Sequence, residues 1–176
     1  MPRILLLRHA MPTQEPAADP AGWVLSSEGV RAACQLAPLL PAGAVLVSSD
    51  EPKAMATLAA AAPGRVIAAE PGLREVRRPR EPFDDTFRES RLAYVAGRPP
   101  AGWEPPAEVA ARVQAAVDRH RDGARPLVLA GHGMAFTTWL AGWPDLLDDP
   151  AAFWSALRLP DLLEVTTGRV RRADPP

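Results

Sequence analysis

The sequence has little of several residue types that carry chemistry. Of its 176 residues only Cys34 is a cysteine, only Lys53 is a lysine, and 3 are histidines. A single cysteine excludes a disulfide within the chain, and the helical apolar pattern around Cys34 predicts a core position rather than a reactive one. With a net charge of −1, the chain has no global field that would favour nucleic acid or a membrane surface.

Long apolar runs, metal-ligand spacings and nucleotide-binding fingerprints are also missing. No stretch approaches the roughly 18 apolar residues of a membrane-spanning helix, and Arg8 interrupts the N-terminal apolar run before it reaches signal-peptide length. The cysteine and histidines lack zinc-site spacing, and neither a Gly-x-x-x-x-Gly-Lys loop nor a Gly-x-Gly-x-x-Gly turn occurs. We therefore expect a cytoplasmic protein with no cofactor, no metal, and no nucleic-acid or membrane partner; the oligomeric state is not predicted.

The rest of the chain alternates between short apolar segments and amphipathic ones. Strands are predicted at residues 3–7, 44–47, 65–69 and 127–130, and a final hairpin at 162–166 and 169–172. Helices are predicted at residues 26–40, 52–62, 84–96, 108–121, 133–140 and 150–157. Such alternation is typical of a parallel sheet between two helical layers. We therefore expect a single α/β domain over residues 1–176, a three-layer α/β/α fold whose mostly parallel sheet has an antiparallel edge strand.

Two of the histidines directly follow a predicted strand. Residues 4–10 read Ile-Leu-Leu-Leu-Arg-His-Ala, and residues 127–134 read Leu-Val-Leu-Ala-Gly-His-Gly-Met. In an open α/β sheet, ligands bind just beyond the carboxyl ends of the strands. A cation and two imidazoles at that edge predict an anion site that contains a nucleophile or a base. The third histidine, His120, ends a polar helix, where a cation suits the helix dipole, and we interpret it as a surface residue.

Four short segments, in this order along the chain, carry a family resemblance. They are Leu7-Arg8-His9-Ala10, Ser48-Ser49-Asp50 with the following Lys53-Ala54, Leu73-Arg74-Glu75, and Gly131-His132-Gly133. Residues 25–29 are also similar to a Leu-Thr-x-x-Gly helix start. Through these motifs the chain resembles a small member of the histidine phosphatase superfamily, in its phosphoglycerate-mutase-like branch. The resemblance implies a phosphoglycerate-mutase-like fold.

The resemblance also implies roles for the residues around the two histidines. His9 matches the histidine that attacks phosphorus and becomes transiently phosphorylated. Arg8 matches an arginine whose planar fork binds the phosphoryl oxygens. His132 matches the second histidine, which donates to a phosphoryl oxygen in the transition state, and Gly133 would let a helix N-terminus approach the phosphate. These are the implied catalytic and phosphate-binding residues.

Glu75 matches the family's general acid, which protonates the leaving oxygen and later takes a proton from water. The other interpretation of Glu75 is a solvated loop carboxylate. The sequence also offers competing acids nearby, namely Asp50, Glu81, Asp84 and Asp85.

Lys53 is the main departure from the family pattern. The family usually has an arginine there as a second phosphate clamp, and a lysine keeps the charge but loses the fork. The alternatives for Lys53 are weaker phosphate binding, a different substrate, lost activity, or a position just outside the pocket.

Arginines also cluster after the third predicted strand. Either Arg74, Arg77 and Arg78 form an electropositive substrate rim, or they belong to a solvated face balanced by nearby acids.

Two functions are compatible with these observations. The first is a metal-independent phosphomonoesterase of the histidine acid type that forms phosphohistidine on His9. Its partner would be a small phosphorylated substrate, such as a sugar phosphate or a nucleotide-like phosphate, or a phosphoprotein that carries phosphohistidine. Hydrolysis is favoured over a mutase reaction because the chain is short for a mutase. The second is a non-catalytic or weakly active phosphate-binding protein on the same fold, because of Lys53; the presence of His9, His132 and Glu75 favours the first.

Overall fold

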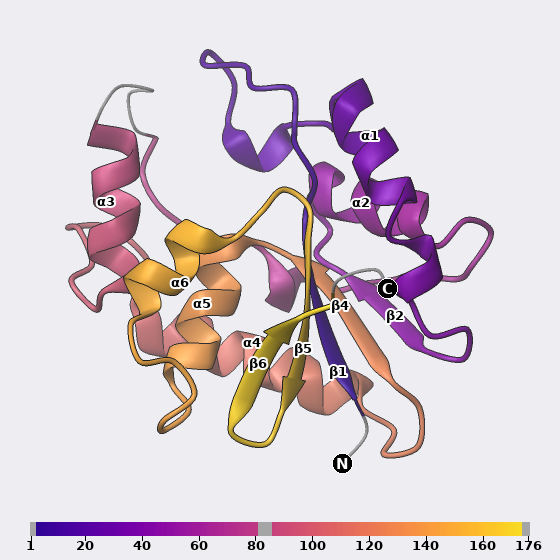
Figure 1. The fold of residues 1–176 in the computed structure, drawn as a ribbon. Coiled ribbons are helices and arrows are strands. Elements are labelled where there is room, and N and C mark those ends of the chain that lie inside the picture. Colours follow the sequence, from indigo (N-terminus) through magenta and orange to yellow (C-terminus); the bar gives the residue numbers. More distant parts are fainter. Residues whose placement is uncertain (1–2, 81–85, 174–176) are drawn as a thin grey trace.

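A six-stranded sheet organises the computed structural model, which describes residues 3–80 and 86–173 (Figure 1). The strands lie in the order β3-β2-β4-β1-β5-β6. Strands β3, β2, β4 and β1 are parallel neighbours, whereas β5 is antiparallel to both β1 and β6. The predicted mostly parallel sheet with an antiparallel edge is therefore confirmed. The strands are β1 (Ile4–Arg8), β2 (Val45–Ser48), β3 (Ala68–Ala69), β4 (Leu127–Gly131), β5 (Asp161–Thr166) and β6 (Arg169–Arg172).

Helices cover both faces of the sheet (Figure 1). One face carries α1 and α2, and the other carries α4 and α5 with α3 and α6 packed against them. The helices are α1 (Ser27–Cys34), α2 (Pro52–Ala61), α3 (Thr86–Val95), α4 (Pro106–His120), α5 (Gly133–Ala141) and α6 (Pro150–Ala156). Short 3-10 turns are η1 (Pro20–Gly22), η2 (Ala37–Leu39) and η3 (Pro71–Leu73).

The central strands are apolar on both sides, which explains their uninterrupted apolar runs in the sequence. In β1, Leu5 and Leu7 pack into the core under α2, whereas Ile4 and Leu6 pack into the core that includes α4 and α5. Successive strand residues point to opposite faces, and both faces of a parallel sheet are covered by helices.

Three local predictions differ from the structure. The first helix ends at Cys34 rather than at residue 40, because a proline at position 38 would clash with the Cys34 carbonyl in a continued helix. Cys34 is exposed, so its predicted core position is wrong. The strand predicted at residues 65–69 is confined to Ala68–Ala69, and the Arg65 side chain instead binds the carbonyls of Pro41 and Ala44.

Residues 81–85 lie outside the described part of the chain, so the start of the helix predicted at residues 84–96 is seen only from Thr86. Across the described residues, no helix combines the length and the apolar character that a membrane span requires.

Candidate active site

The register of three parallel strands brings distant residues to one edge of the sheet. Arg8 lies opposite Gly131 on β1 and β4, and β2 lies on the other side of β4, where the Ser49 N–H donates to the Ala130 carbonyl. Because the carboxyl ends of these strands coincide, the next residues of the chain leave the sheet side by side. The ring centroids of His9 and His132 are 5.2 Å apart.

His9 is fixed in one tautomer by its neighbour. Its Nδ1 lies 2.8 Å from the Ala10 carbonyl oxygen, which can only accept, so Nδ1 carries the proton and Nε2 carries the lone pair. Burial lowers the pKa of His9 to about 3, against the opposing effect of the Ala10 hydrogen bond and with a contribution from nearby Lys53 and Arg8. The imidazole is therefore neutral near pH 7, as a nucleophile must be.

His132 is fully buried beside it and is also neutral. Burial, followed by the proximity of His9, holds the pKa of His132 well below its usual value. Its Nε2 lies 3.0 Å from the Ser49 Oγ, which already accepts from the Glu51 N–H at 3.2 Å. When the hydroxyl donates to Nε2, the ring proton lies on Nδ1. Among the described residues this buried Nδ1 has no partner, and a bound oxyanion would satisfy it.

Arg8 presents a second buried donor. Its Nη1 donates to the Leu157 carbonyl at 2.9 Å, which holds the guanidinium against the segment after α6. Its Nε is buried and has no partner within the described part of the chain. A Cβ on Gly133 would lie 3.1 Å from this Nε, so the glycine leaves the space that the guanidinium occupies.

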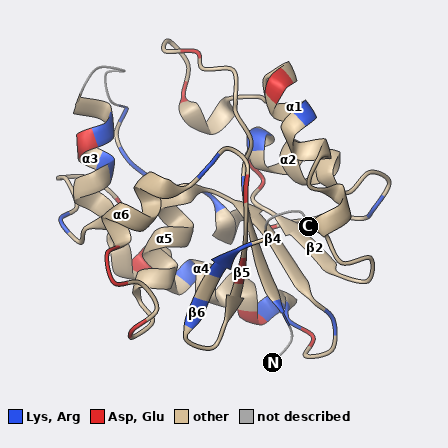
Figure 2. Cartoon of the chain, in the orientation of Figure 1, with Lys and Arg blue, Asp and Glu red and all other residues tan. Residues whose placement is uncertain are grey.

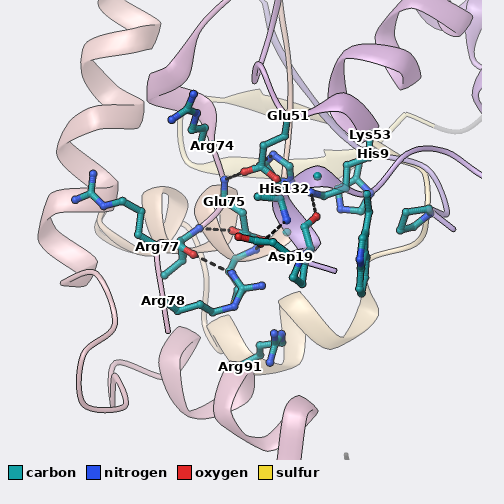
Figure 3. A pocket seen from close by; sticks show the side chains of 18 of the residues that line it. His9, Asp19, Glu51, Lys53, Arg74, Glu75, Arg77, Arg78, Arg91 and His132 are labelled. Carbon is teal, nitrogen blue, oxygen red and sulfur yellow. Dashed lines mark hydrogen bonds and ion pairs between the residues drawn. The ribbon is translucent and has the colours of Figure 1, made fainter. Parts of the chain in front are cut away.

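Glu75 reaches the pocket from the segment after η3. Its Oε1 accepts from the N–H groups of Ala135 at 2.9 Å and Val76 at 3.0 Å, and its Oε2 accepts from Met134 at 3.3 Å. Two of these donors belong to the N-terminus of α5, where a negative charge is favoured. The structure thus places Glu75 in the pocket wall (Figure 3). Of the competing acids, Asp50 is paired with Arg74, and Glu81, Asp84 and Asp85 lie outside the described residues.

An ion pair that the sequence reasoning missed, between Arg112 and Glu104, supports the Glu75 segment. Arg112 on α4 donates to the carbonyls of Gly72, Arg74 and Glu75 at 2.8, 2.7 and 3.2 Å. Its guanidinium is also paired with the fully buried carboxylate of Glu104, at 2.9 and 3.0 Å. These hydrogen bonds from Arg112 therefore hold the loop that carries Glu75 against α4. The place of Arg112 inside an ordinary amphipathic helix, far along the chain from that loop, gave no signal.

Lys53 lines the pocket, so the alternative of a position outside it is wrong. The side chain is buried, and its Nζ donates to the Pro20 carbonyl at 2.7 Å and to the Glu51 Oε2 at 2.5 Å. Glu51 is a further residue that the sequence reasoning missed. Its Oε1 accepts from the Glu75 N–H at 2.8 Å and lies 3.5 Å from the His132 Nε2. The signal was its position directly between the Ser-Ser-Asp loop and Lys53.

These side chains line a cavity of about 880 Å³. Basic residues occur on α3 and on the described segment that ends before residue 81 (Figure 2), and the predicted rim residues Arg74, Arg77 and Arg78 do line the cavity. Arg74 and Arg77 are, however, paired with Asp50 and Glu104, as expected for charges balanced by nearby acids, and their role as a substrate rim stays a prediction.

Aromatic side chains form another part of the wall. Trp23, Phe87 and Trp154 line the cavity, and the Arg88 guanidinium lies 5.3 Å above the Trp154 ring.

The third histidine, His120, does not line this cavity. It ends α4, and its Nε2 lies 2.9 Å from the Glu70 carboxylate. Within residues 3–80 and 86–173, no group of three or more His, Cys, Asp or Glu side chains is arranged to hold a metal ion.

Two neutral histidines, a partly buried arginine and a carboxylate meet at the carboxyl edge of the parallel strands, so the chain is an α/β protein with a histidine-centred pocket. Residues 4–172 match the family model of the histidine phosphatase superfamily (branch 1). The chain belongs to that superfamily, as its motifs predicted.

Solved structures agree with the fold. The mycobacterial glucosyl-3-phosphoglycerate phosphatase in complex with inorganic phosphate is 25% identical, with a TM-score of 0.68 and coverage of 99% of this chain and 96% of that one. Phosphoglycerate mutase from Thermus thermophilus is 23% identical, with a TM-score of 0.70 and coverage of 99% of both chains. The comparison with curated proteins finds no match.

Proposed function

We propose that the protein is a phosphomonoesterase that works through a phosphohistidine on His9. The observation that carries this proposal is the state of His9, a neutral imidazole whose Nδ1–H is held by the Ala10 carbonyl while Nε2 keeps its lone pair. Beside it, the Arg8 Nε and the His132 Nδ1 are buried without partners among the described residues. These two donors would bind the phosphoryl oxygens and stabilise the charge that develops on them.

The first half of the reaction transfers the phosphoryl group to the protein. The His9 Nε2 attacks phosphorus, an N–P bond forms, and the bond from phosphorus to the ester oxygen breaks. Glu75, in its protonated form, gives its proton to the leaving oxygen, and the alcohol departs. The phosphorylated ring stays oriented, because its Nδ1–H still donates to the Ala10 carbonyl.

The second half returns the protein to its starting state. A water molecule attacks the phosphohistidine, and Glu75, now a carboxylate, takes one of its protons. The N–P bond breaks, His9 becomes neutral again, and inorganic phosphate leaves. The chain's own side chains supply the nucleophile, the acid and the positive charge, so each of these steps proceeds as metal-independent chemistry.

The shape of the pocket supports a small organic phosphate as the substrate. The histidines lie deep in the cavity, and Trp23, Phe87 and Trp154 provide apolar surface for the rest of the molecule. A sugar phosphate or a nucleotide-like phosphate suits this combination better than a phosphohistidine on the surface of a folded protein. A similar structure is that of a glucosyl-3-phosphoglycerate phosphatase, which supports the sugar-phosphate class.

A mutase and a phosphate-binding protein are the competing functions. Chain length no longer argues against the mutase, because this chain spans 99% of a phosphoglycerate mutase of the same fold. The phosphate-binding alternative rests on Lys53, whose Nζ is shared between Glu51 and the Pro20 carbonyl. Release of inorganic phosphate in step with alcohol production distinguishes hydrolysis from both.

The test is hydrolysis of p-nitrophenyl phosphate in EDTA by the wild type, by His9→Ala and by His120→Ala. The third histidine is the matched control, since it pairs with Glu70 outside the cavity. We expect turnover in the wild type and in His120→Ala and none in His9→Ala, with thermal melts confirming that all three fold. Turnover that persists in His9→Ala would refute the mechanism. No turnover in the wild type, together with tight binding of inorganic phosphate, would favour the binding protein.

A further inference from the structure

The pair of Glu51 and Lys53 places a carboxylate inside a pocket that is otherwise built for an anion. Glu51 and Lys53 are both buried, and the Glu51 Oε2 lies 2.5 Å from the Lys53 Nζ. The Glu51 Oε1 lies 3.5 Å from the Nε2 of His132, the ring nitrogen opposite the Nδ1 that would bind the phosphoryl group (Figure 3). Glu51 itself lines the cavity, so a doubly charged phosphate that enters it meets a negative charge among the lining side chains.

The same contact weakens Lys53 as a phosphate ligand. An ammonium group has three protons, and two of those of Lys53 are directed to Glu51 and to the Pro20 carbonyl. While Glu51 is ionised, the positive charge of Lys53 is compensated within the pair. The only lysine of the chain thus contributes its full charge to a bound anion only when Glu51 is neutral.

We propose that Glu51 is a positioning residue that pairs with Lys53 before the anion binds and takes up a proton from solvent when the anion enters, which releases the charge of Lys53 to the anion. This inference rests on the proposed phosphate-binding function of the pocket. The protonated carboxyl group keeps Oε1 as the acceptor for the Glu75 N–H, and a proton on Oε2 removes the negative charge that faces the Lys53 Nζ.

The surroundings of Glu51 favour this proton uptake. Burial raises the pKa of Glu51, opposed chiefly by Lys53, and an incoming anion would raise it further. The charged or titratable groups that face Glu51 are Lys53 from α2, Glu75 and Arg74 from the segment after η3, and His132 from the start of α5. His9, at the end of β1, lines the same cavity. Both histidines have lowered pKa values and stay neutral near pH 7 before an anion binds.

Because anion binding is coupled to proton uptake, the affinity for the anion depends on pH. The occupied pocket binds one more proton than the free pocket at any pH between the two pKa values of Glu51, so anion affinity falls as pH rises through that window. Glu75 is the rival carboxyl group, because it also lines the pocket and is expected to carry a proton in the first half of the reaction.

The probe is sulfate, a dianion that does not itself titrate near neutrality. Calorimetric titrations from about pH 5 to about pH 9, in two buffers of different ionisation enthalpy, give both the affinity and the number of protons taken up. For the wild type and for Glu75→Gln, we expect affinity to fall up to about tenfold per pH unit within the window, with uptake approaching one proton. For Glu51→Gln, which keeps an amide oxygen for the Glu75 N–H, we expect no such uptake and tighter binding than the wild type at high pH.

Proton uptake that persists in Glu51→Gln, or that disappears in Glu75→Gln, would overturn the proposal. Infrared difference spectra of the wild type provide a measurement that needs no variant to fold: a carboxylic acid C=O band should appear on sulfate binding, and its absence would also overturn the proposal. Turnover of an aryl phosphate together with pH-independent sulfate binding would refute the role of Glu51 alone. Uptake dependent on Glu51 in a protein without turnover would refute the hydrolytic function alone.

Discussion

Replacing Glu75 with glutamine should separate the leaving-group step from the rest of the reaction. The glutamine oxygen can take the place of Oε1, which accepts from the N–H groups of Ala135 and Val76 at 2.9 and 3.0 Å. The glutamine NH₂ group cannot accept from the Met134 N–H at 3.3 Å. One long hydrogen bond is therefore lost, which costs about 1 kcal/mol of folding stability.

The expected catalytic effect is larger than this structural cost. A positioned general acid contributes roughly 10²–10⁴-fold, or about 3–5 kcal/mol of the barrier. This full loss applies to an alkyl phosphate, whose leaving oxygen needs a proton. An aryl phosphate such as p-nitrophenyl phosphate leaves as a stable anion and should lose much less.

The assay is kcat/KM for glycerol phosphate and for p-nitrophenyl phosphate, since this ratio reports the steps up to phosphorylation of His9. Asp118→Asn is the control, because Asp118 contacts Gln114 on α4 outside the cavity and should leave both values unchanged. An equal loss on both substrates in Glu75→Gln would refute the assignment and point to Glu51 or Asp50 as the acid.

Three further substitutions test how the pocket is built. Lys53→Met should weaken inhibition by inorganic phosphate roughly tenfold or more, through loss of a charge-assisted hydrogen bond; unchanged inhibition would show that Lys53 does not touch the phosphate. Gly133→Ala places a Cβ 3.1 Å from the Arg8 Nε and should weaken vanadate binding with a small change in stability; unaltered binding would contradict the placement of Arg8. Gly29→Ala places a Cβ 2.2 Å from the Met11 carbonyl oxygen and should destabilise the fold by about 3 kcal/mol; calorimetry that shows an unchanged Tm would contradict this close approach.

The two histidines could be predicted to lie close together from the sequence, because only the positions of the strand ends were needed. A short apolar run followed by a polar residue identifies the carboxyl end of a buried strand, and such ends share one edge of a parallel sheet. The order β2-β4-β1 then places His9 and His132 side by side, although more than a hundred residues separate them. The early end of the first helix was missed, although the proline at position 38 could have indicated it.

The contacts of Glu51 and Arg112 were not predictable in the same way. Glu51 is one charged residue at the start of a helix, and only the approach of Glu75 and His132 from other elements makes it part of the pocket. Arg112 lies on the polar-to-apolar boundary of α4, and its role depends on three carbonyl groups that a loop turns toward it. Arg112 therefore left no periodic or motif signal in the sequence, and Glu51 left only its position between the Ser-Ser-Asp loop and Lys53.

If His9 carries the phosphoryl group, the phosphohistidine can be trapped and located in the chain. The wild type is mixed with a ³²P-labelled substrate, quenched in base, where phosphohistidine is stable, and digested to locate the label. His120→Ala and His9→Ala are treated in parallel. We expect an acid-labile label on the peptide that contains His9 in the wild type and in His120→Ala, and no label in His9→Ala. Label on another residue, or turnover without any label on His9, would contradict the proposed intermediate.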